Sequence, residues 1–167
     1  MLNQTLAFID IETTGLDRDT HEIIELGAVI ARMKDGEFVV TDELNLKIQP
    51  KNLENAEPQA LRINGYNEAD WLFAVSLEDA MKELAKKADG AVFVAHNVTF
   101  DYGFIESAFK KTNIENKMHY HKIDTISLAF GILHSNDDLG KLSLKALCEK
   151  YGIENKKAHS AFADAYA

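Results

Sequence analysis

Residues 7–15 read Ala-Phe-Ile-Asp-Ile-Glu-Thr-Thr-Gly, and the rest of the chain is organised around this stretch. It begins as an apolar run with β-branched side chains, which predicts a buried strand. Side chains on a strand alternate between its two faces, so Asp10 and Glu12 point the same way and Ile11 points into the core. Two carboxylates side by side at the end of a buried strand repel each other unless they stay hydrated, share a proton or bind a cation. Magnesium or manganese suits such an all-oxygen site.

A plainer interpretation of the pair is a strand end that carries two solvated acids. The pattern Asp-x-Glu is short and common by chance, so on its own it favours this plainer interpretation. A metal site therefore requires further ligands from other parts of the chain.

Composition limits the class of protein. The chain has 167 residues, 46% of them hydrophobic, which is enough for one globular domain with its own core. The formal net charge of −9 argues against wrapping duplex DNA, which needs a broad basic face. A nucleic-acid enzyme is not excluded, because bound cations reverse the local field and a short single strand held near one end needs few phosphate contacts.

The sequence shows neither the N-terminal pattern of a signal peptide nor an apolar run long enough to span a membrane. Its single cysteine, Cys148, cannot form a disulfide framework and fits a reducing compartment. We therefore expect a cytoplasmic protein with no membrane partner.

Periodicity and turn signals predict strands first and then helices that alternate with strands. This order indicates an α/β domain with a mixed sheet, and the absence of repeats or a linker indicates one domain over residues 1–167. Strands are expected at 5–11, 22–32, 37–49, 91–95 and 122–124, and helices at 58–63, 77–88, 100–111, 125–133, 143–151 and 161–167.

Asp101 is a candidate ligand that would join the first pair. It lies in the first turn of a helix that follows the predicted buried strand 91–95, and α/β sheets bind ligands at the carboxyl ends of their strands. The alternative is that Asp101 only complements the dipole of its helix.

His159 and Asp164 are a second candidate pair. Five residues on one helix are separated by roughly 140°, so the two side chains share a site only if His159 lies on the loop before the helix. The alternative is a surface histidine followed by a solvated helix acid.

Three segments together resemble a known family. They are residues 8–16 (Phe-Ile-Asp-Ile-Glu-Thr-Thr-Gly-Leu), 96–101 (His-Asn-Val-Thr-Phe-Asp) and 159–165 (His-Ser-Ala-x-x-Asp-Ala). In order and separation they resemble the three exonuclease motifs of the DEDD superfamily, histidine subclass. That group includes the proofreading epsilon subunit of bacterial DNA polymerase III, RNase T and oligoribonuclease. Residues 143–153 also resemble the segment before the third motif of that family.

The resemblance implies a ribonuclease H-like fold, in which helices flank a mixed five-stranded sheet of order 3-2-1-4-5. It also implies two divalent cations, Mg²⁺ or Mn²⁺, and release of nucleoside 5′-monophosphates from a 3′ end. By the same resemblance His159 matches the general base, and the metal ligands are Asp10, Glu12, Asp101 and Asp164. We expect Asp10 to bridge the cations, Glu12 and Asp164 to complete one of them, and Asp101 to act mainly through water on the other.

The substrate contacts follow from the same motifs. The backbone of residues 13–16 is expected to receive the terminal nucleotide, and Leu16 and Phe100 to press on base faces. Plain core packing at a helix start is the alternative for Phe100. Where the family often carries His-Gly-Ile, this chain has Asn64-Gly65-Tyr66, which leaves substrate preference open. The predicted substrate-binding residues are Thr13, Thr14, Gly15, Leu16, His96, Asn97 and Phe100.

The resulting prediction is a 3′–5′ exonuclease that acts on the 3′ end of single-stranded nucleic acid. The Glu-Thr-Thr-Gly start favours DNA and a DNA polymerase subunit as partner. The alternatives are an RNA-processing exoribonuclease of the RNase T type and a binding module with reduced activity. The intact ligand set argues against the binding module.

The final helix is expected to be incomplete, because only three residues follow Asp164 where members of the family continue. A helix this short is marginal on its own. The alternative is that Phe162 and Tyr166, four residues apart, pack inward and hold it.

Overall fold

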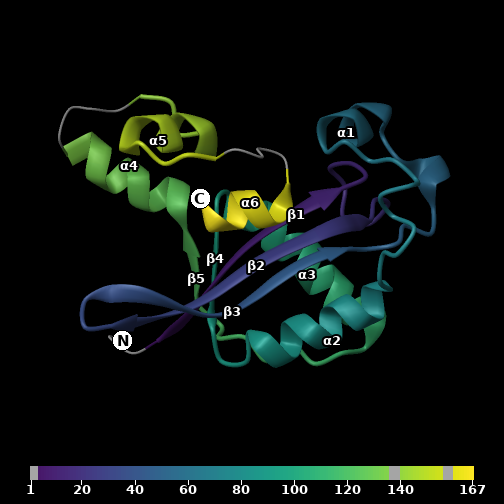
Figure 1. Cartoon of the computed structure of the whole chain (residues 1–167), viewed down its shortest axis with the longest axis horizontal. Coiled ribbons are helices and arrows are strands. Elements are labelled where there is room, and N and C mark those ends of the chain that lie inside the picture. Colours follow the sequence, from purple (N-terminus) through teal and green to yellow (C-terminus); the bar gives the residue numbers. More distant parts are fainter. Residues whose placement is uncertain (1–3, 136–139, 156–159) are drawn as a thin grey trace.

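The computed structural model describes residues 4–135, 140–155 and 160–167. Its centre is a five-stranded sheet of order β3-β2-β1-β4-β5 (Figure 1). The three strands β1 to β3 pair in antiparallel fashion, whereas β4 and β5 run parallel to β1 and to each other. The predicted strand order is therefore confirmed. The strands are β1 (Thr5–Thr13), β2 (Ile23–Lys34), β3 (Glu37–Lys47), β4 (Val92–Ala95) and β5 (Lys122–Asp124).

Helices flank the sheet on both faces, with α2 and α3 on one side of it and α6 lying across β1 and β2 (Figure 1). No helix in the described ranges is long and apolar enough to cross a membrane. The helices are α1 (Pro58–Ile63), α2 (Leu77–Lys87), α3 (Val98–Thr112), α4 (Thr125–Ser135), α5 (Leu144–Tyr151) and α6 (Ala161–Tyr166), with a 3₁₀ turn η1 (Leu53–Asn55).

The main core lies between the sheet and the pair α2 and α3. Alternate residues of β1 enter it, as the sequence predicts: Ile9 and Ile11 are buried and contribute to one cluster with Leu84 of α2 and Ile105 of α3. Full burial of each such side chain contributes about 1.5–3 kcal/mol. The alternation of β1 leaves Asp10 and Glu12 on the opposite face, toward α6.

Two element boundaries differ from the predictions in ways that matter for the site. Strand β1 runs to Thr13 instead of residue 11, because β2 continues to pair with it as far as Ile23. Helix α3 begins at Val98 instead of residue 100. The preceding Asn97 adopts a left-handed conformation (φ 71°, ψ 58°), and this sharp corner starts the helix directly after β4.

Helix α6 is held at its N-terminus. Gly27 of β2 lies directly beneath it, and a Cβ atom at this glycine would lie 2.3 Å from the backbone of Ala161. Tyr166 at the other end of the helix contacts the ring of Phe162 but is 63% exposed, so the alternative in which Tyr166 packs inward is wrong. Close backbone contact with β2 therefore positions this short helix.

Candidate active site

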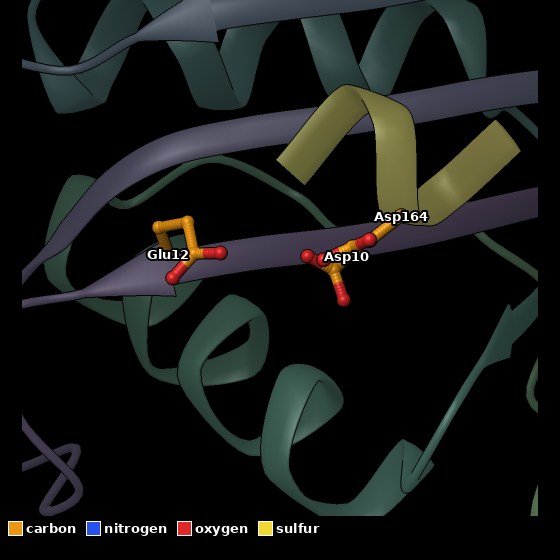
Figure 2. A group of neighbouring side chains, drawn as sticks. All are labelled: Asp10, Glu12 and Asp164. Atoms are coloured by element: carbon orange, nitrogen blue, oxygen red, sulfur yellow. The ribbon is translucent and has the colours of Figure 1, made fainter. Parts of the chain in front are cut away.

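Three carboxylates from two elements converge on the α6 face of the sheet. Asp10 and Glu12 come from β1, and Asp164 comes from the first turn of α6. Figure 2 shows Asp164 reaching from α6 toward Asp10, with Glu12 farther along the same strand. One oxygen from each of the three side chains lies within 4.8 Å of the others. The alternation of side chains along β1 thus supplies two carboxylates, and the packing of α6 on the sheet supplies the third.

Asp101 lies beside this group and not within it. The side chain is only 3% exposed, and its Oδ1 accepts a hydrogen bond from the backbone N–H of Ile11 at 3.2 Å. Pairing between β1 and β4 stops at Phe8 and Val94, so this N–H lies beyond the reach of the β4 ladder. Asp101 takes the place of the missing strand partner, which fixes its carboxylate at the carboxyl end of the parallel strands.

The cluster is electrostatically strained without a counterion. Burial, and then the charges of Asp101, Asp164, Glu12 and Glu25, raise the pKa of Asp10 to about 9. Burial and the neighbouring carboxylates also raise the pKa of Glu12 to about 7. Burial raises the pKa of Asp101 to about 7, although the Ile11 hydrogen bond acts in the opposite direction. Such a set of repelling oxygen donors fits a divalent cation, which would remove the repulsion.

These raised pKa values predict how the metal-free protein responds to pH. A carboxyl group whose pKa is higher in the folded state contributes stability that is fully present below its unfolded pKa and is lost as pH rises through the folded pKa. For Asp10 and Glu12 this window runs from 3.8 and 4.5 up to about 9 and about 7. We expect the melting temperature in EDTA to fall as pH rises across the window, and Mn²⁺ to reverse much of the fall. A melting temperature in EDTA that rises with pH over this range would show that the pKa values of Asp10 and Glu12 are not raised in the folded protein.

Glu25 is a residue that the sequence analysis did not single out. It lies opposite Glu12 on β2, and its Oε2 accepts a hydrogen bond from the N–H of Ala161 at 3.3 Å. Its Oε1 lies 3.8 Å from Nζ of Lys47, which in turn sits 3.6 Å above the ring of Trp71. Glu25 therefore links β2 and β3 to the first residue of α6. Only the register of β2 reveals this role, since an acid in a strand carries no signal by itself.

Asn155 is a second such residue. Its Nδ2 donates a hydrogen bond to Oδ1 of Asp164 at 2.5 Å, which orients that carboxylate from the loop before α6. No sequence pattern predicts this contact, because a lone asparagine in a predicted loop has many uses. His159, the predicted base, lies outside the described residues, two positions before α6 begins.

The chain at the end of β1 buries two threonines and exposes the leucine that follows Gly15. Thr13 is buried and donates its hydroxyl to the carbonyl of Gly15 at 2.7 Å, and Thr14 is buried and accepts from the N–H of Glu22 at 2.9 Å. Gly15 packs against the ring of His21, which a Cβ atom would approach to 2.5 Å. Leu16, by contrast, is 76% exposed. The backbone is occupied too: the N–H and C=O of Thr14 bond to Glu22 and Glu57, and the C=O of Thr13 accepts from the side-chain amide of Asn64. Contact of this backbone with the substrate therefore stays a prediction.

His96 and Asn97 form the corner between β4 and α3. His96 lines an apolar cavity of about 300 Å³ together with Asp10 and Asp164, and its Nδ1 lies 2.9 Å from Oγ1 of Thr125. Burial lowers the pKa of His96, which favours the neutral imidazole. The side chain of Asn97 accepts a hydrogen bond from the Thr99 hydroxyl at 3.1 Å, within the corner itself.

Phe100 and Leu16 line a separate cavity of about 260 Å³ at the start of α3. Phe100 is half-buried, belongs to the edge of the core and lies 5.1 Å from Phe104 between ring centroids. Core packing, the alternative stated for Phe100, is therefore confirmed, whereas contact of Phe100 with a base stays a prediction.

Comparison with known proteins agrees with this geometry. The family model described as exonuclease (RNase T) matches residues 7–167. Ribonuclease T of Histophilus somni is 37% identical over 172 residues, which cover 94% of this chain and 76% of that protein. A PolC-type DNA polymerase III of Staphylococcus saprophyticus is 32% identical over 163 residues, or 98% of this chain and 11% of the polymerase. Escherichia coli exonuclease I in complex with a dT13 oligonucleotide has a TM-score of 0.80 at 19% identity, covering 98% of this chain and 39% of that chain.

A sheet of this order with carboxylates at the carboxyl end of β1 has the ribonuclease H-like fold, and the matching family model and relatives place it among the DEDD exonucleases. The chain belongs to the exonuclease family that its family model describes, as the three sequence motifs predict. It spans only 11% of the polymerase and 39% of exonuclease I, so it corresponds to one part of each of those proteins.

Proposed function

We propose that residues 1–167 form one exonuclease domain that removes nucleotides from the 3′ end of single-stranded nucleic acid, preferably DNA, as nucleoside 5′-monophosphates. The observation that carries this proposal is the group of Asp10, Glu12 and Asp164 oxygens within 4.8 Å of one another, with buried Asp101 beside it. Continuation of the final helix beyond residue 167 stays a prediction.

The four carboxylates would hold two divalent cations, Mg²⁺ or Mn²⁺. When bound, such cations neutralise the phosphodiester and lower the pKa of the attacking water. Asp10 would be the central ligand, because the charges of the other three carboxylates all act on its carboxyl group. Glu12 and Asp164 would hold a cation with it, and Asp101, whose carboxylate accepts from the N–H of Ile11, would contribute the fourth carboxylate.

The protein also handles the proton and the leaving nucleotide. His159 would accept the proton of the attacking water, since an imidazole with a pKa near ~6.5 is a suitable base at neutral pH. The terminal base would enter the cavity between Leu16 and Phe100, with the 3′ hydroxyl at the backbone of residues 13–16. His96, which shares a cavity with Asp10 and Asp164, and Asn97 at the start of α3 would add substrate contacts.

Support for the two kinds of nucleic acid differs in origin. The PolC-type polymerase and the exonuclease I complex with dT13 favour DNA and a polymerase partner. The 37% identity to a ribonuclease T favours RNA as the second candidate substrate. A cytoplasmic location is proposed on the basis of the single, buried Cys148.

The test is incubation of the purified protein with 5′-labelled single-stranded DNA and RNA of one sequence, with Mg²⁺, Mn²⁺ or EDTA. We expect a ladder that shortens from the 3′ end, faster on DNA, and no cleavage in EDTA. A closed circular single strand should resist cleavage, because the site receives a chain end.

The circle serves as the control for polarity. Efficient nicking of the circle, or full activity in EDTA, would rule out the proposed reaction. A faster ladder on RNA would select the ribonuclease alternative.

A further inference from the structure

The cavity between Leu16 and Phe100 has both apolar and polar walls. Phe104, one turn further along α3, adds a second aromatic ring, and the polar residues of the lining are Asp17, Arg18 and Thr99. Flat apolar walls match the faces of a nucleobase, whereas a guanidinium matches acceptor atoms on the edge of a base. The cavity therefore offers contacts to both parts of one base.

The guanidinium of Arg18 is placed against α3 by a glycine. A Cβ atom at Gly103 would lie 2.8 Å from Nη1 of Arg18, so any other residue at this position would push the end of the arginine side chain away. Gly103 sits in the interior of α3, where glycine is less favourable than alanine. The absence of a side chain at Gly103 leaves the space that the end of the Arg18 side chain occupies.

The backbone of Arg18 is fixed as well. The carbonyl of the preceding Asp17 accepts hydrogen bonds from the N–H groups of Thr20 at 3.2 Å and His21 at 2.8 Å. Nζ of Lys111 on α3 donates to the carbonyl of Arg18 at 3.1 Å. The tight turn and the lysine together hold the arginine at the mouth of the cavity.

The guanidinium also keeps its donors available. In residues 4–135, 140–155 and 160–167 no carboxylate forms an ion pair with Arg18, although the whole chain carries a net charge of −9. Arg18 stands between two acids in the sequence, Asp17 and Asp19, and the carboxylate of Asp17 accepts the N–H of Asp19 at 2.9 Å. An arginine whose backbone is held in place and whose guanidinium forms no ion pair can present its planar set of donors to a ligand.

We propose that Arg18 reads the edge of the 3′-terminal base and favours guanine. The proposal rests on the proposed exonuclease function, which places the terminal base in this cavity. The only phosphate of the terminal nucleotide is the scissile one at the carboxylates, so the group beside Arg18 is the base. Two N–H donors of a guanidinium match O6 and N7 of guanine, whereas adenine presents an amino donor in place of O6.

The first test measures binding of GMP and AMP, the product nucleotides, by calorimetry in the presence of Mg²⁺. We expect the wild-type protein to bind GMP about fivefold or more tightly than AMP. Arg18→Ala should remove this difference while leaving AMP affinity nearly unchanged. Arg18→Lys should restore little of it, because an ammonium lacks the planar pair of donors.

Gly103→Ala supplies a variant that keeps the arginine but displaces it. We expect it to lose most of the preference for GMP with no loss of melting temperature, because alanine suits a helix interior. Arg32→Ala is the matched control, since Nε of Arg32 donates to Thr5 at the far end of β1, and its nucleotide preference should equal that of wild type.

The second test measures cleavage of oligonucleotides that differ only in the 3′-terminal base. The wild-type protein should remove guanine about fivefold faster than adenine under single-turnover conditions, and Arg18→Ala should equalise the two. If Arg18→Ala slows all four ends by the same factor and weakens the salt dependence of binding, Arg18 contacts a phosphate and the base-reading proposal is wrong. Equal wild-type rates on all four ends would also overturn it. A wild-type protein that cleaves none of them would instead refute the proposed exonuclease function.

Discussion

Replacement of Asp10 by Asn should abolish exonuclease turnover, with a loss on the order of a thousandfold or more. Asp10 is the ligand on which the charges of Asp101, Asp164 and Glu12 all converge, and an amide oxygen carries no charge to hold a cation against the phosphodiester. The side chain keeps its size, so the sheet should be unchanged. Turnover is measured on 5′-labelled single-stranded DNA with Mn²⁺.

The same substitution should raise the stability of the metal-free protein. Burial and neighbouring acids raise the pKa of Asp10 to about 9, so above its ordinary pKa the folded protein must either hold a proton there or bury a charge. An amide avoids both costs. In EDTA the melting temperature of Asp10→Asn should therefore exceed that of wild type by a margin that grows as pH rises from about 4 to about 9.

Mn²⁺ separates the two effects, because it should stabilise the wild-type protein and not the variant. Asp42→Asn is the matched control, because Asp42 lies on the edge strand β3 and pairs with Lys87. Its turnover should equal that of wild type. Wild-type turnover in Asp10→Asn, or equal stabilisation of both proteins by Mn²⁺, would overturn the assignment.

Replacement of Gly27 by Ala should cost about a hundredfold in turnover, because a displacement of roughly 1 Å at a catalytic group has an effect of this size. The added Cβ atom would lie 2.3 Å from the carbonyl carbon and oxygen of Ala161 and from the backbone nitrogen of Phe162. These are backbone atoms, so the whole N-terminus of α6 must move and Asp164 must move with it. Overpacking of this kind also destabilises by about 1–3 kcal/mol.

The structural signature of this variant is loss of metal affinity with retention of the fold. The core between β1, α2 and α3 is separate from the seat of α6, so circular dichroism should stay native while calorimetry shows weaker Mn²⁺ binding. Gly131→Ala in α4 is the control, since a Cβ atom there would meet nothing within 4 Å. Wild-type Mn²⁺ affinity in Gly27→Ala would show that α6 does not depend on this contact.

The sequence alone determined the parts of the site that depend on local periodicity. Alternation along β1 placed Asp10 and Glu12 on one face and Ile11 in the core, and the structure confirms both. The position of Asp101 in the first turn of a helix after a buried strand also followed from local signals. The strand order 3-2-1-4-5 came from the resemblance of three motifs, since hydrophobic patterns identify strands but do not say which strands are neighbours.

Only the tertiary structure decided how the third segment reaches the first. The spacing of His159 and Asp164 does not say where the final helix lies, and the alternative of inward packing by Tyr166 is wrong. The N-terminus of α6 is instead positioned by Glu25 and Gly27, which lie two residues apart on one face of β2. Asn155 orients the carboxylate of Asp164 from the loop before the helix. Arg18 acquires its place only because Gly103 lies beneath it. These contacts join residues far apart in sequence, so they depend on strand register and on helix docking, which no local pattern encodes.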